Sequence, residues 1–222
     1  MAKRVFDVVA SLIGLILLSP ILLVTALLIK LDSPGGVFFR GERIGRYGKP
    51  FRIFKFRSMV EGTDKSGKMN VSDADCCITR VGRFLRHSKL DEFPQLINVF
   101  FGEMSLVGYR PELQYYVNMY TDEEKPILDL LPGITDWASI VNSQQYKGFT
   151  QADDPDQYYL EEVRPLKLRL QLYYRYHHGF FSDIGCILLT LYKVIAHSEW
   201  LPKEVQTIVD DYRREKALRE AS

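Results

Sequence analysis

The stretch VVASLIGLILLSPILLVTALLI, residues 8–29, is the feature from which the architecture of this chain can be worked out, because none of its residues carries a charge. As a helix it would be about 33 Å long at roughly 1.5 Å per residue, enough to cross the hydrocarbon core of a membrane. A secretory signal peptide usually has a shorter apolar region that ends at small residues, which the following Lys30-Leu31-Asp32 does not provide. We therefore expect the run to be retained as a membrane helix.

Ser19-Pro20 lies in the middle of this run. Proline removes a backbone hydrogen bond and clashes with the preceding turn, so a bend is predicted there. Basic residues flank the run on both sides, Lys3 and Arg4 before it and Lys30 after it, and they pull both ends toward the cytoplasm. The residues alone leave two topologies open: a helix that enters, breaks and returns to the same face, and one that spans the membrane.

Charge is unevenly distributed along the 222 residues, although the net charge is only +1. Residues 1–60 contain ten Lys and Arg against three Asp and Glu, so this part carries +7 and the remainder −6. A basic segment beside an apolar run indicates an anionic partner, either a phospholipid surface or nucleic acid. The adjacent apolar run favours the membrane surface. With 46% apolar residues, a disordered or fibrous chain is excluded, and the length suits one domain with an appendage.

The rest of the chain is predicted to be mostly helical with a few strands, an α+β fold. β-Branched and aromatic residues on either side of 45–50 predict a short β-hairpin, and the polar residues 61–75 predict a loop. A turn or loop is expected at 132–135. Helices are expected at 79–87, from Asp91 onward, and at 111–120, 121–131, 161–178, 183–197 and 203–219. The helix at 183–197 is short and contains Lys193, so we interpret it as a core or interfacial helix rather than a second membrane segment.

The last of these helices is amphipathic, with Val205, Ile208, Val209 and Tyr212 on one stripe. Familiar catalytic motifs are missing from the sequence: there is no P-loop, GxSxG, HExxH or dinucleotide fingerprint. The three cysteines form no CxxC pair, so neither a disulfide framework nor a zinc site is indicated.

The acidic pair Asp91-Glu92 is the most distinctive chemical feature that remains. With Pro94 close behind, it indicates a helix start, where exposed amides and the helix dipole favour negative charge, so both carboxylates are expected to be ionised near neutral pH. Such a pair is ordinarily a helix cap, but phosphoryl transfer also requires a carboxylate or base among fixed cations, often with a divalent metal. The candidate cations are Lys55, Arg57, Arg86 and Arg110. On a basic, membrane-attached scaffold, this combination favours a phosphorylated lipid as substrate.

Six blocks carry a resemblance to a known family: KRVFDVVAS, LLSPILLVTALLIKLDSPG, VFFRGERIGRYGKPFRIFKFRSM, ITRVGRFLRHSKLDEFPQLINVFFGEMSLVGYRPE, LPGIT and YYRYHHGFFSDIGCILLT. In this order, over residues 3–196, they resemble the bacterial sugar transferase family of small monotopic phosphoglycosyl transferases. The resemblance implies transfer of a sugar 1-phosphate from a UDP-sugar to undecaprenyl phosphate, with release of UMP and dependence on Mg²⁺. This reaction is the first membrane step in the assembly of bacterial glycoconjugates and polysaccharides.

The roles of individual residues follow from the same resemblance. Asp91 matches the aspartate that attacks the β-phosphoryl group of the donor and forms a covalent phospho-sugar intermediate. Glu92 matches its partner, which acts as a general base or organises the metal, so the two carboxylates are the expected Mg²⁺ ligands. The expected substrate-binding residues are Lys55, Arg57, Arg86, Arg110 and Pro111.

Ser19 and Pro20 match the break in the family's re-entrant membrane helix. The resemblance therefore implies a re-entrant helix over residues 1–32, with both termini in the cytoplasm, and a cytosolic membrane-associated catalytic domain over 33–197 with interfacial amphipathic helices. Residues 198–222 would form an amphipathic tail. The implied location is the cytoplasmic face of the bacterial inner membrane. The expected partners are the UDP-sugar, undecaprenyl phosphate and membrane phospholipids, without nucleic acid, and a homodimer is compatible with the resemblance.

Two blocks depart from the family pattern. The usual Pro-Arg-Pro loop is Tyr109-Arg110-Pro111 here, and the usual GITGWAQVNGR block reads GITDWASIVNSQQ, so Asp136 replaces a glycine and the arginine is lost. This change leaves three interpretations open: a different sugar specificity, a subgroup in which Lys147 or Arg164 substitutes, or a membrane-anchored adaptor that keeps the fold without catalysis.

Overall fold

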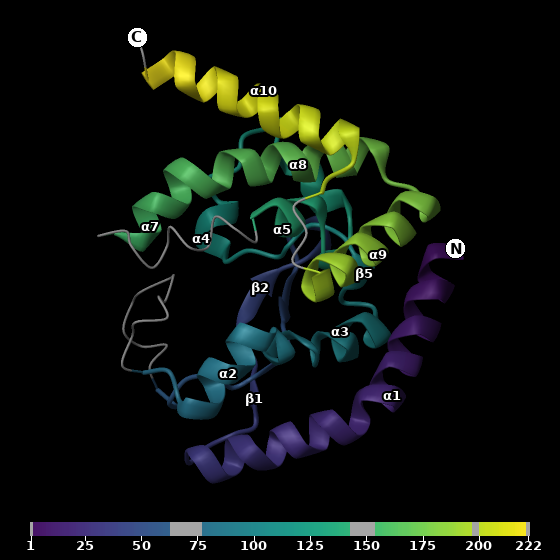
Figure 1. Cartoon of the computed structure of the whole chain (residues 1–222), viewed down its shortest axis with the longest axis vertical. Helices are drawn as coiled ribbons and strands as arrows, with labels where there is room; N and C mark the ends of the chain where they lie inside the picture. Colours follow the sequence, from purple (N-terminus) through teal and green to yellow (C-terminus); the bar gives the residue numbers. More distant parts are fainter. Residues whose placement is uncertain (1, 63–76, 143–153, 197–199, 221–222) are drawn as a thin grey trace.

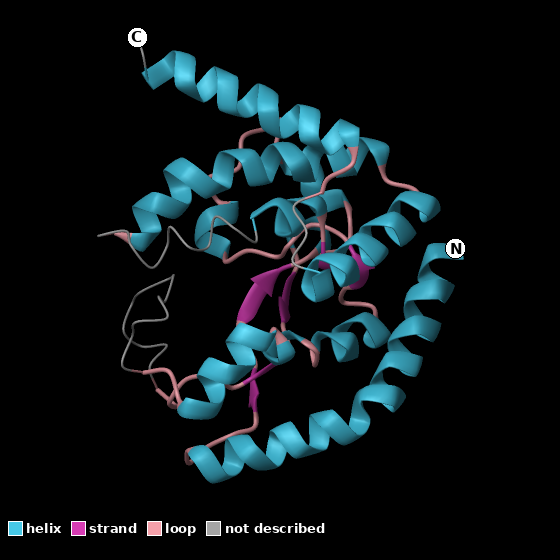
Figure 2. Ribbon diagram, viewed as in Figure 1, coloured by secondary structure: helices cyan, strands magenta, loops and turns pink. Residues whose placement is uncertain are grey.

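The structure is a computed structural model that describes residues 2–62, 77–142, 154–196 and 200–220. The described part is mostly helical with six short strands, which confirms the predicted α+β class. These strands form three two-stranded sheets at the centre of the molecule, and the longer helices lie around them (Figure 2). Most of the predicted loop at 61–75 and one cysteine, Cys76, lie outside the described residues; Cys186 is a buried free thiol.

The first helix, α1 (Ala2–Asp32), is bent near its middle, where Pro20 lies (Figure 1). Proline cannot donate a backbone hydrogen bond to the carbonyl of Ile16, one turn earlier. The hydroxyl of Ser19 donates to that carbonyl instead, with an Oγ–O distance of 2.7 Å. The bend expected at Ser19-Pro20 is thus present, and Ser19 supplies a hydrogen bond to the carbonyl that Pro20 cannot reach.

The first arm of α1 is fixed to the domain by a buried carboxylate. Asp7, only 1% exposed, accepts hydrogen bonds from the Ser105 hydroxyl at 2.8 Å and from the Leu106 backbone N–H at 3.1 Å. Both donors belong to strand β5 (Ser105–Val107). A buried carboxylate must be paired or hydrogen-bonded, so this contact specifies how α1 lies against β5.

The two basic residues that precede the apolar run also contact the protein itself. Lys3 forms an ion pair with Asp183 at 2.5 Å and donates to the Val107 carbonyl at 3.1 Å. Arg4 donates to two carbonyls at the C-terminal end of helix α3 (Gln95–Phe101), at 2.7 and 3.0 Å. Both residues therefore help to anchor the first arm of α1 to the domain.

The second arm of α1 is fixed by apolar packing. Ile29, 2% exposed, lies in a cluster with Phe56 and Leu85, which come from strand β4 and helix α2 (Arg80–Ser88). The N-cap of α2 is Thr79, whose side chain accepts from the Gly82 N–H, as its sequence predicts. Both ends of α1 are therefore in contact with the same folded domain.

The predicted β-hairpin is confirmed. Strands β2 and β3 are antiparallel, with Glu42 opposite Arg52, and the turn between them has positive φ angles at Tyr47 (58°) and Gly48 (72°). Strands β1 and β4 form a second antiparallel pair, which lies near the C-terminal end of α1, where Phe56 packs against Ile29. The strands are β1 (Phe38–Phe39), β2 (Glu42–Ile44), β3 (Pro50–Arg52) and β4 (Lys55–Phe56).

The prediction of a turn or loop at 132–135 was wrong, because strand β6 (Gly133–Thr135) pairs in parallel with β5. Three-residue strands are too short to show a periodic pattern, and this pair joins segments far apart in sequence. The pairing depends on close approach of two glycines: a Cβ on Gly108 would lie 2.2 Å from the Leu131 carbonyl oxygen, and one on Gly133 would lie 2.1 Å from the Gly108 nitrogen.

Two other predicted helices are shorter than expected. The segment 111–120 is helical only in α4 (Gln114–Val117), and 121–131 contains only the 3-10 helix η4 (Lys125–Asp129), which has a proline in its first turn. Both segments contribute single side chains to the core, such as Tyr116 and Ile127, instead of a continuous apolar face.

The predicted C-terminal helices are present and pack together. Val205 and Val209 of the last helix, each 1% exposed, share a core with Leu170 and Cys186 from the two helices before it. Residues 203–220 therefore pack against the other C-terminal helices, and the helix at 180–196 contributes to the core, in agreement with its interpretation as a core or interfacial helix. The elements are α5 (Trp137–Asn142), α7 (Pro155–Tyr158), the π-helix η5 (Tyr159–Val163), α8 (Arg164–His177), α9 (Phe180–Ala196) and α10 (Lys203–Glu220).

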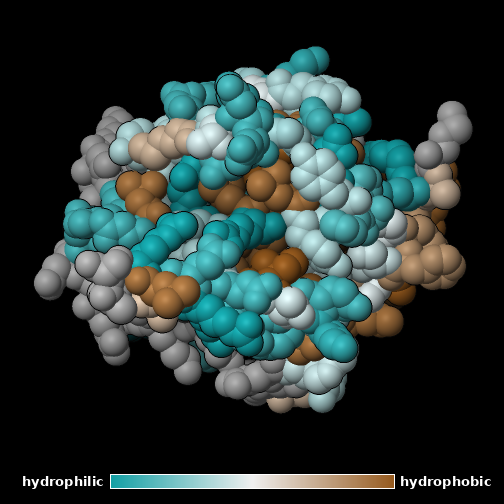
Figure 3. Space-filling model, turned by 90° about the horizontal axis from the view of Figure 1, so that it is seen from above, coloured by the Kyte–Doolittle hydropathy of each residue, from teal (hydrophilic) through white to brown (hydrophobic). Residues whose placement is uncertain are grey.

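The outer surface of α1 is strongly apolar. Within the described residues, α1 is the one helix that is long and apolar enough to cross a membrane, and little of it is buried. Exposed apolar side chains of α9, including Phe181 and Leu188, add to this surface. In Figure 3, brown apolar surface gathers at the edge on the side of α1 and α9, whereas the face seen is largely hydrophilic. The exposed apolar residues of α1 include Val9, Ile13, Ile16, Leu17, Leu23, Val24, Leu27 and Leu31.

The close approach of β5 and β6 leads to a prediction for Gly108→Ala. The added methyl group would force the two backbones apart, so we expect the free energy of unfolding to fall by about 3 kcal/mol or more. Thermal unfolding in detergent would measure this loss. Gly185→Ala is the matched control, because a Cβ there meets nothing within 4 Å; equal losses in the two variants would contradict the prediction.

Candidate active site

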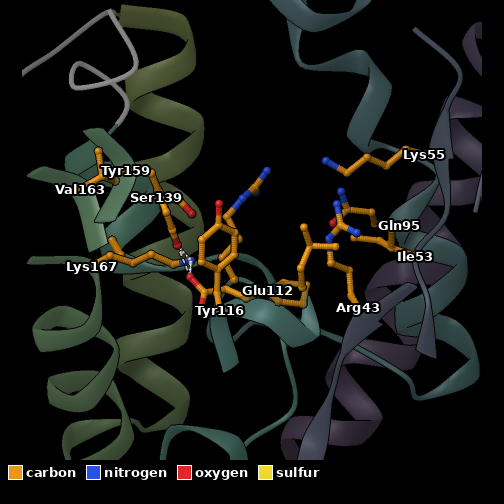
Figure 4. A pocket seen from close by; sticks show the side chains of 14 residues that line it. Arg43, Ile53, Lys55, Gln95, Glu112, Tyr116, Ser139, Tyr159, Val163 and Lys167 are labelled. Atoms are coloured by element: carbon orange, nitrogen blue, oxygen red, sulfur yellow. Dashed lines mark hydrogen bonds and ion pairs between the residues drawn. The ribbon is translucent and has the colours of Figure 1, made fainter. Parts of the chain in front are cut away.

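A polar cleft of about 200 Å³ lies between the β2–β3 hairpin with α3 on one side and the α5, η5 and α8 helices on the other. Figure 4 shows Lys55, Gln95 and Arg43 on the first wall and Tyr159, Ser139 and Lys167 on the second. The loop that follows β5, with Arg110 and Pro111, completes the lining.

Glu92 contacts Lys55 and Arg110, two residues that line this cleft, so Asp91 and Glu92 lie next to it, although neither carboxylate is part of the lining itself. Helix α2 is capped at its C-terminus by Lys89, whose φ of 59° is left-handed, and a 3-10 turn, Leu90–Glu92, follows immediately. Helix α3 begins only after Pro94. The predicted helix start is thus a 3-10 turn between two helices, and it places both carboxylates near Lys55 and Arg110.

Glu92 is fixed by two cations. Arg110 donates to both of its oxygens, at 2.5 and 3.2 Å, and Lys55 donates to Oε1 at 2.8 Å. Burial alone would raise the pKa of Glu92, but the charges and hydrogen bonds of Arg110 and Lys55 outweigh it and hold that pKa well below its ordinary range. The expectation that Glu92 is ionised agrees with this direction.

Asp91 has the opposite environment. The residue is 9% exposed, and its buried Oδ1 has no hydrogen-bond partner in the described part of the chain. Burial and the neighbouring charge of Glu92 raise its pKa, and Lys55, Lys89 and Arg110 only partly offset this. Burial thus raises the pKa of Asp91, whereas the helix start expected from the sequence would lower it. An oxygen without donors keeps its lone pairs available, which favours a role as nucleophile or metal ligand.

The residues present fit a Mg²⁺ ion of the kind that the family resemblance implies. In the part of the chain that the structure describes, no three or more His, Cys, Asp and Glu side chains gather as a metal cage. Mg²⁺, however, usually binds through one or two carboxylates together with water and substrate phosphates. The unpartnered oxygen of Asp91 offers such a ligand, with Glu92 beside it.

The remaining predicted site residues separate into two groups. Pro111 lines the cleft together with Lys55 and Arg110. Arg57 does not: it is 7% exposed, and its guanidinium donates to the carbonyls of Ser33 and Pro34, which connect α1 to β1. Arg86 is half-buried on α2 and is likewise outside the lining of the cleft.

A buried hydrogen-bond network on the second wall was not predicted from the sequence. Glu112, 5% exposed, pairs with Lys167 at 2.5 Å and also accepts from the hydroxyls of Tyr120 and Tyr159. Burial, opposed by Lys167 and reinforced by Glu112, raises the pKa of Tyr159 to about 12. Glu112 belongs to the quoted block that ends in GYRPE, which was a signal for it, but Lys167 and Tyr159 stand in a segment that showed only helical spacing.

The cleft also gathers positive charge. Arg43 and Arg110 both line the cleft, and burial together with the nearby charge of Arg110 lowers the pKa of Arg43. Of the two substitutes considered for the lost arginine, Lys147 lies outside the described residues and Arg164 pairs with Glu124 at 3.5 Å, away from the lining. Lys167, one turn after Arg164, is the residue of this helix that reaches the cleft.

A second, apolar pocket of about 400 Å³ lies inside the bend of α1. Pro94 forms part of its wall, so it adjoins the turn that carries Asp91. The other lining residues are Ser19, Leu22, Leu23, Ala26, Val37, Phe38 and Phe56.

Cations around a carboxylate pair, beside a helix of membrane length, are typical of a membrane-associated transferase that handles phosphate groups. Comparison with known proteins agrees with this class. A family model described as bacterial sugar transferase matches residues 1–197, and the chain belongs to this family.

Three relatives show how far the similarity extends. The chain is 36% identical to a UDP-N-acetylgalactosamine-undecaprenyl-phosphate N-acetylgalactosaminephosphotransferase of Aeromonas hydrophila, over 87% of this chain and 44% of the relative. It is 36% identical to a UDP-glucose:undecaprenyl-phosphate glucose-1-phosphate transferase of Escherichia coli, over 86% of this chain and 39% of the relative. An uncharacterized sugar transferase of Bacillus subtilis, EpsL, is 35% identical over 87% of both chains. The chain thus spans less than half of the first two relatives.

The environment of Asp91 predicts that Asp91→Asn stabilises the protein. Folding raises the pKa of Asp91, so the protonated carboxyl group favours the folded state. This contribution to stability is present below the pKa that Asp91 has in the unfolded chain, and it is lost as the pH rises through its pKa in the folded protein. Near neutral pH the ionised group is a cost, which the neutral amide removes. Thermal unfolding in EDTA-containing detergent should show a higher Tm for Asp91→Asn and a lower one for Glu92→Gln, which loses its ion pairs. A lower Tm for Asp91→Asn would contradict this account.

Proposed function

We propose that this protein transfers a sugar 1-phosphate from a UDP-sugar to undecaprenyl phosphate through a covalent aspartyl intermediate. The observation that carries the proposal is the buried, unpartnered oxygen of Asp91 next to Glu92, which Arg110 and Lys55 hold in place. The relatives whose names state this type of reaction support it.

In the first step, a carboxylate oxygen of Asp91 attacks the β-phosphorus of the donor. A bond forms between Asp91 and this phosphorus, the bond from the phosphorus to the bridging oxygen of the diphosphate breaks, and UMP leaves with that oxygen. In the second step, a phosphate oxygen of the acceptor attacks the same phosphorus and releases the Asp91 carboxylate. The product is undecaprenyl-diphospho-sugar.

The cations of the cleft neutralise the phosphate groups that these steps bring together. A carboxylate is a weak nucleophile and is repelled by an anionic phosphate, so Lys55, Arg110 and Arg43 lower the barrier by reducing that repulsion. Mg²⁺, held by Asp91 and Glu92 with the donor diphosphate, would supply further charge neutralisation at this place.

The apolar pocket inside the bend of α1 suits the polyprenyl chain of the acceptor. Its lining is almost wholly apolar and includes Leu22, Phe38 and Phe56. Pro94 brings the pocket within one turn of Asp91. An acceptor chain seated here would place its phosphate beside the reacting carboxylate.

The re-entrant topology is part of the same proposal. Asp7 fixes the first arm of α1 to β5, and Ile29 packs the second arm against α2 and β4. A domain that contacts both ends of one helix cannot lie on both sides of a hydrocarbon layer about 30 Å thick. Both ends therefore belong on one face, and the basic flanks favour the cytoplasmic face of the bacterial inner membrane, with the outer surface of α1 in contact with phospholipid.

The proposed reaction predicts that Asp91→Ala and Asp91→Asn lose UMP release by roughly a thousandfold or more, because no nucleophile remains. Glu92→Gln should lose roughly ten- to a hundredfold, since the pair with Arg110 is weakened. The measurement uses a panel of UDP-sugars with undecaprenyl phosphate and Mg²⁺, and Asp211→Asn, on the exposed side of α10, is the control.

Undiminished turnover by Asp91→Ala would contradict the mechanism. If the wild type released no UMP from any donor in the panel, the enzymatic proposal would be wrong, and the altered GITDWASIVNS block would favour the non-catalytic adaptor.

The topology predicts equal accessibility of the two ends of the chain. In a variant whose Cys76 and Cys77 are replaced by Ser, we expect Ala2→Cys and Lys203→Cys to be labelled from the cytoplasmic side only. Ser19→Cys, at the bend, should be shielded from impermeant reagent on both sides. Labelling of the first two positions from opposite sides of the membrane would show a spanning helix.

A further inference from the structure

Asp136 is a buried carboxylate that the mechanism above does not use. It is 1% exposed and follows directly after β6. Its partners come from three separate elements: the Arg110 N–H at 3.2 Å, the Ser139 N–H at 2.6 Å and the Gln171 side-chain amide at 3.0 Å.

The parallel pairing of β5 and β6 explains why Asp136 meets the loop that carries Arg110. The carboxyl ends of parallel strands lie at the same edge of a sheet. The pair of Val107 with Thr135 and the hydrogen bond from the Gly108 N–H to the Thr135 carbonyl, at 3.1 Å, hold the two segments side by side at this end of the sheet. Asp136 follows Thr135 and reaches the backbone of Arg110 at this edge.

The same residue, Arg110, is thus fixed at two points. Its backbone N–H is bound to Asp136, and its guanidinium donates to both oxygens of Glu92. Two parallel hydrogen bonds between a guanidinium and a carboxylate require closer alignment than one ammonium contact does. The position of the backbone at Arg110 therefore determines whether this double contact forms.

A carboxylate suits this position better than an amide. Oδ1 accepts from Ser139, and Oδ2 accepts from both Arg110 and Gln171. An asparagine has only one acceptor oxygen and would turn its NH₂ group toward one of these donors. Within the described residues no ion pair to Asp136 is found, so the three N–H donors are what stabilise its negative charge.

We propose that Asp136 is a positioning residue for the transfer reaction: it holds the backbone of Arg110 so that the guanidinium aligns with Glu92. This inference rests on the proposed function. Asp136 touches no reacting atom, and it acts through Arg110.

Asp136→Ser tests the proposal, because a serine hydroxyl still accepts from the Ser139 N–H at the start of α5 but leaves the Arg110 N–H without its acceptor. We expect kcat for UMP release to fall about ten- to a hundredfold, the range of a lost hydrogen bond to a charged group, with KM for the UDP-sugar changed by less than about threefold. Asp154→Ser is the matched control: Asp154 caps α7 in the same way without contacting Arg110, and kcat should stay within about twofold.

A double-mutant cycle separates positioning from general stability. Lysine cannot make the double contact with Glu92, so Asp136→Ser added to Arg110→Lys should cost less than about threefold beyond Arg110→Lys alone. An equal loss in both backgrounds would overturn the proposal, as would a kcat of Asp136→Ser within about threefold of the wild type. If thermal unfolding shows that Asp136→Ser is not folded, Asp136→Asn takes its place, and the same changes in kcat support or overturn the proposal.

The two proposals fail in different ways. Absence of UMP release by the wild type with every donor would overturn the proposed function and this inference together. Wild-type turnover with a fully active Asp136→Ser would overturn the inference alone.

Discussion

The contact between Asp7 and β5 ties the membrane helix to the catalytic part of the protein. A carboxylate at 1% exposure is stable only where donors are already in place, and Ser105 and Leu106 supply them from one strand. This strand leads within three residues to Arg110. A sliding or rotation of α1 would leave the carboxylate unpaired, so the position of α1 and the position of the candidate site cannot vary independently.

Asp91 and Glu92 are adjacent in sequence and yet have opposite electrostatic environments. Glu92 faces Arg110 and Lys55, which lower its pKa, whereas Asp91 is buried beside a negative charge, which raises its pKa. Pairs of titratable groups driven apart in this way are characteristic of sites that assign different tasks to similar groups. In the proposed reaction, Glu92 is held by its ion pairs, and Asp91, whose Oδ1 has no hydrogen-bond partner among the described residues, acts as the nucleophile.

Features with long or locally specified patterns could be predicted from the sequence. The bend at Pro20, the hairpin around Gly48, and the helices α2, α8, α9 and α10 all depend on local chemistry or on repeated apolar spacing. The β5–β6 pair could not be predicted, since three-residue strands paired in parallel leave no periodic signal. Lys55 and Arg57 were both predicted to bind substrate, but β4 ends at Phe56, and the Arg57 guanidinium donates to Ser33 and Pro34, just after α1. The pairing of Glu112 with Lys167 joins segments that only the tertiary structure brings together.

The short segment 91–95 separates two very different environments. Pro94 lines the apolar pocket under α1, Gln95 lines the polar cleft, and Asp91 precedes both by about one helical turn. In the proposed reaction, a soluble, highly charged donor and a lipid-borne acceptor would therefore have separate approaches to the same carboxylate. The proposed covalent intermediate suits this arrangement, because the phospho-sugar would stay on Asp91 while UMP leaves the cleft. The cations of the cleft could then neutralise the acceptor phosphate, so one set of charges would serve both steps and the two anions would not have to share it.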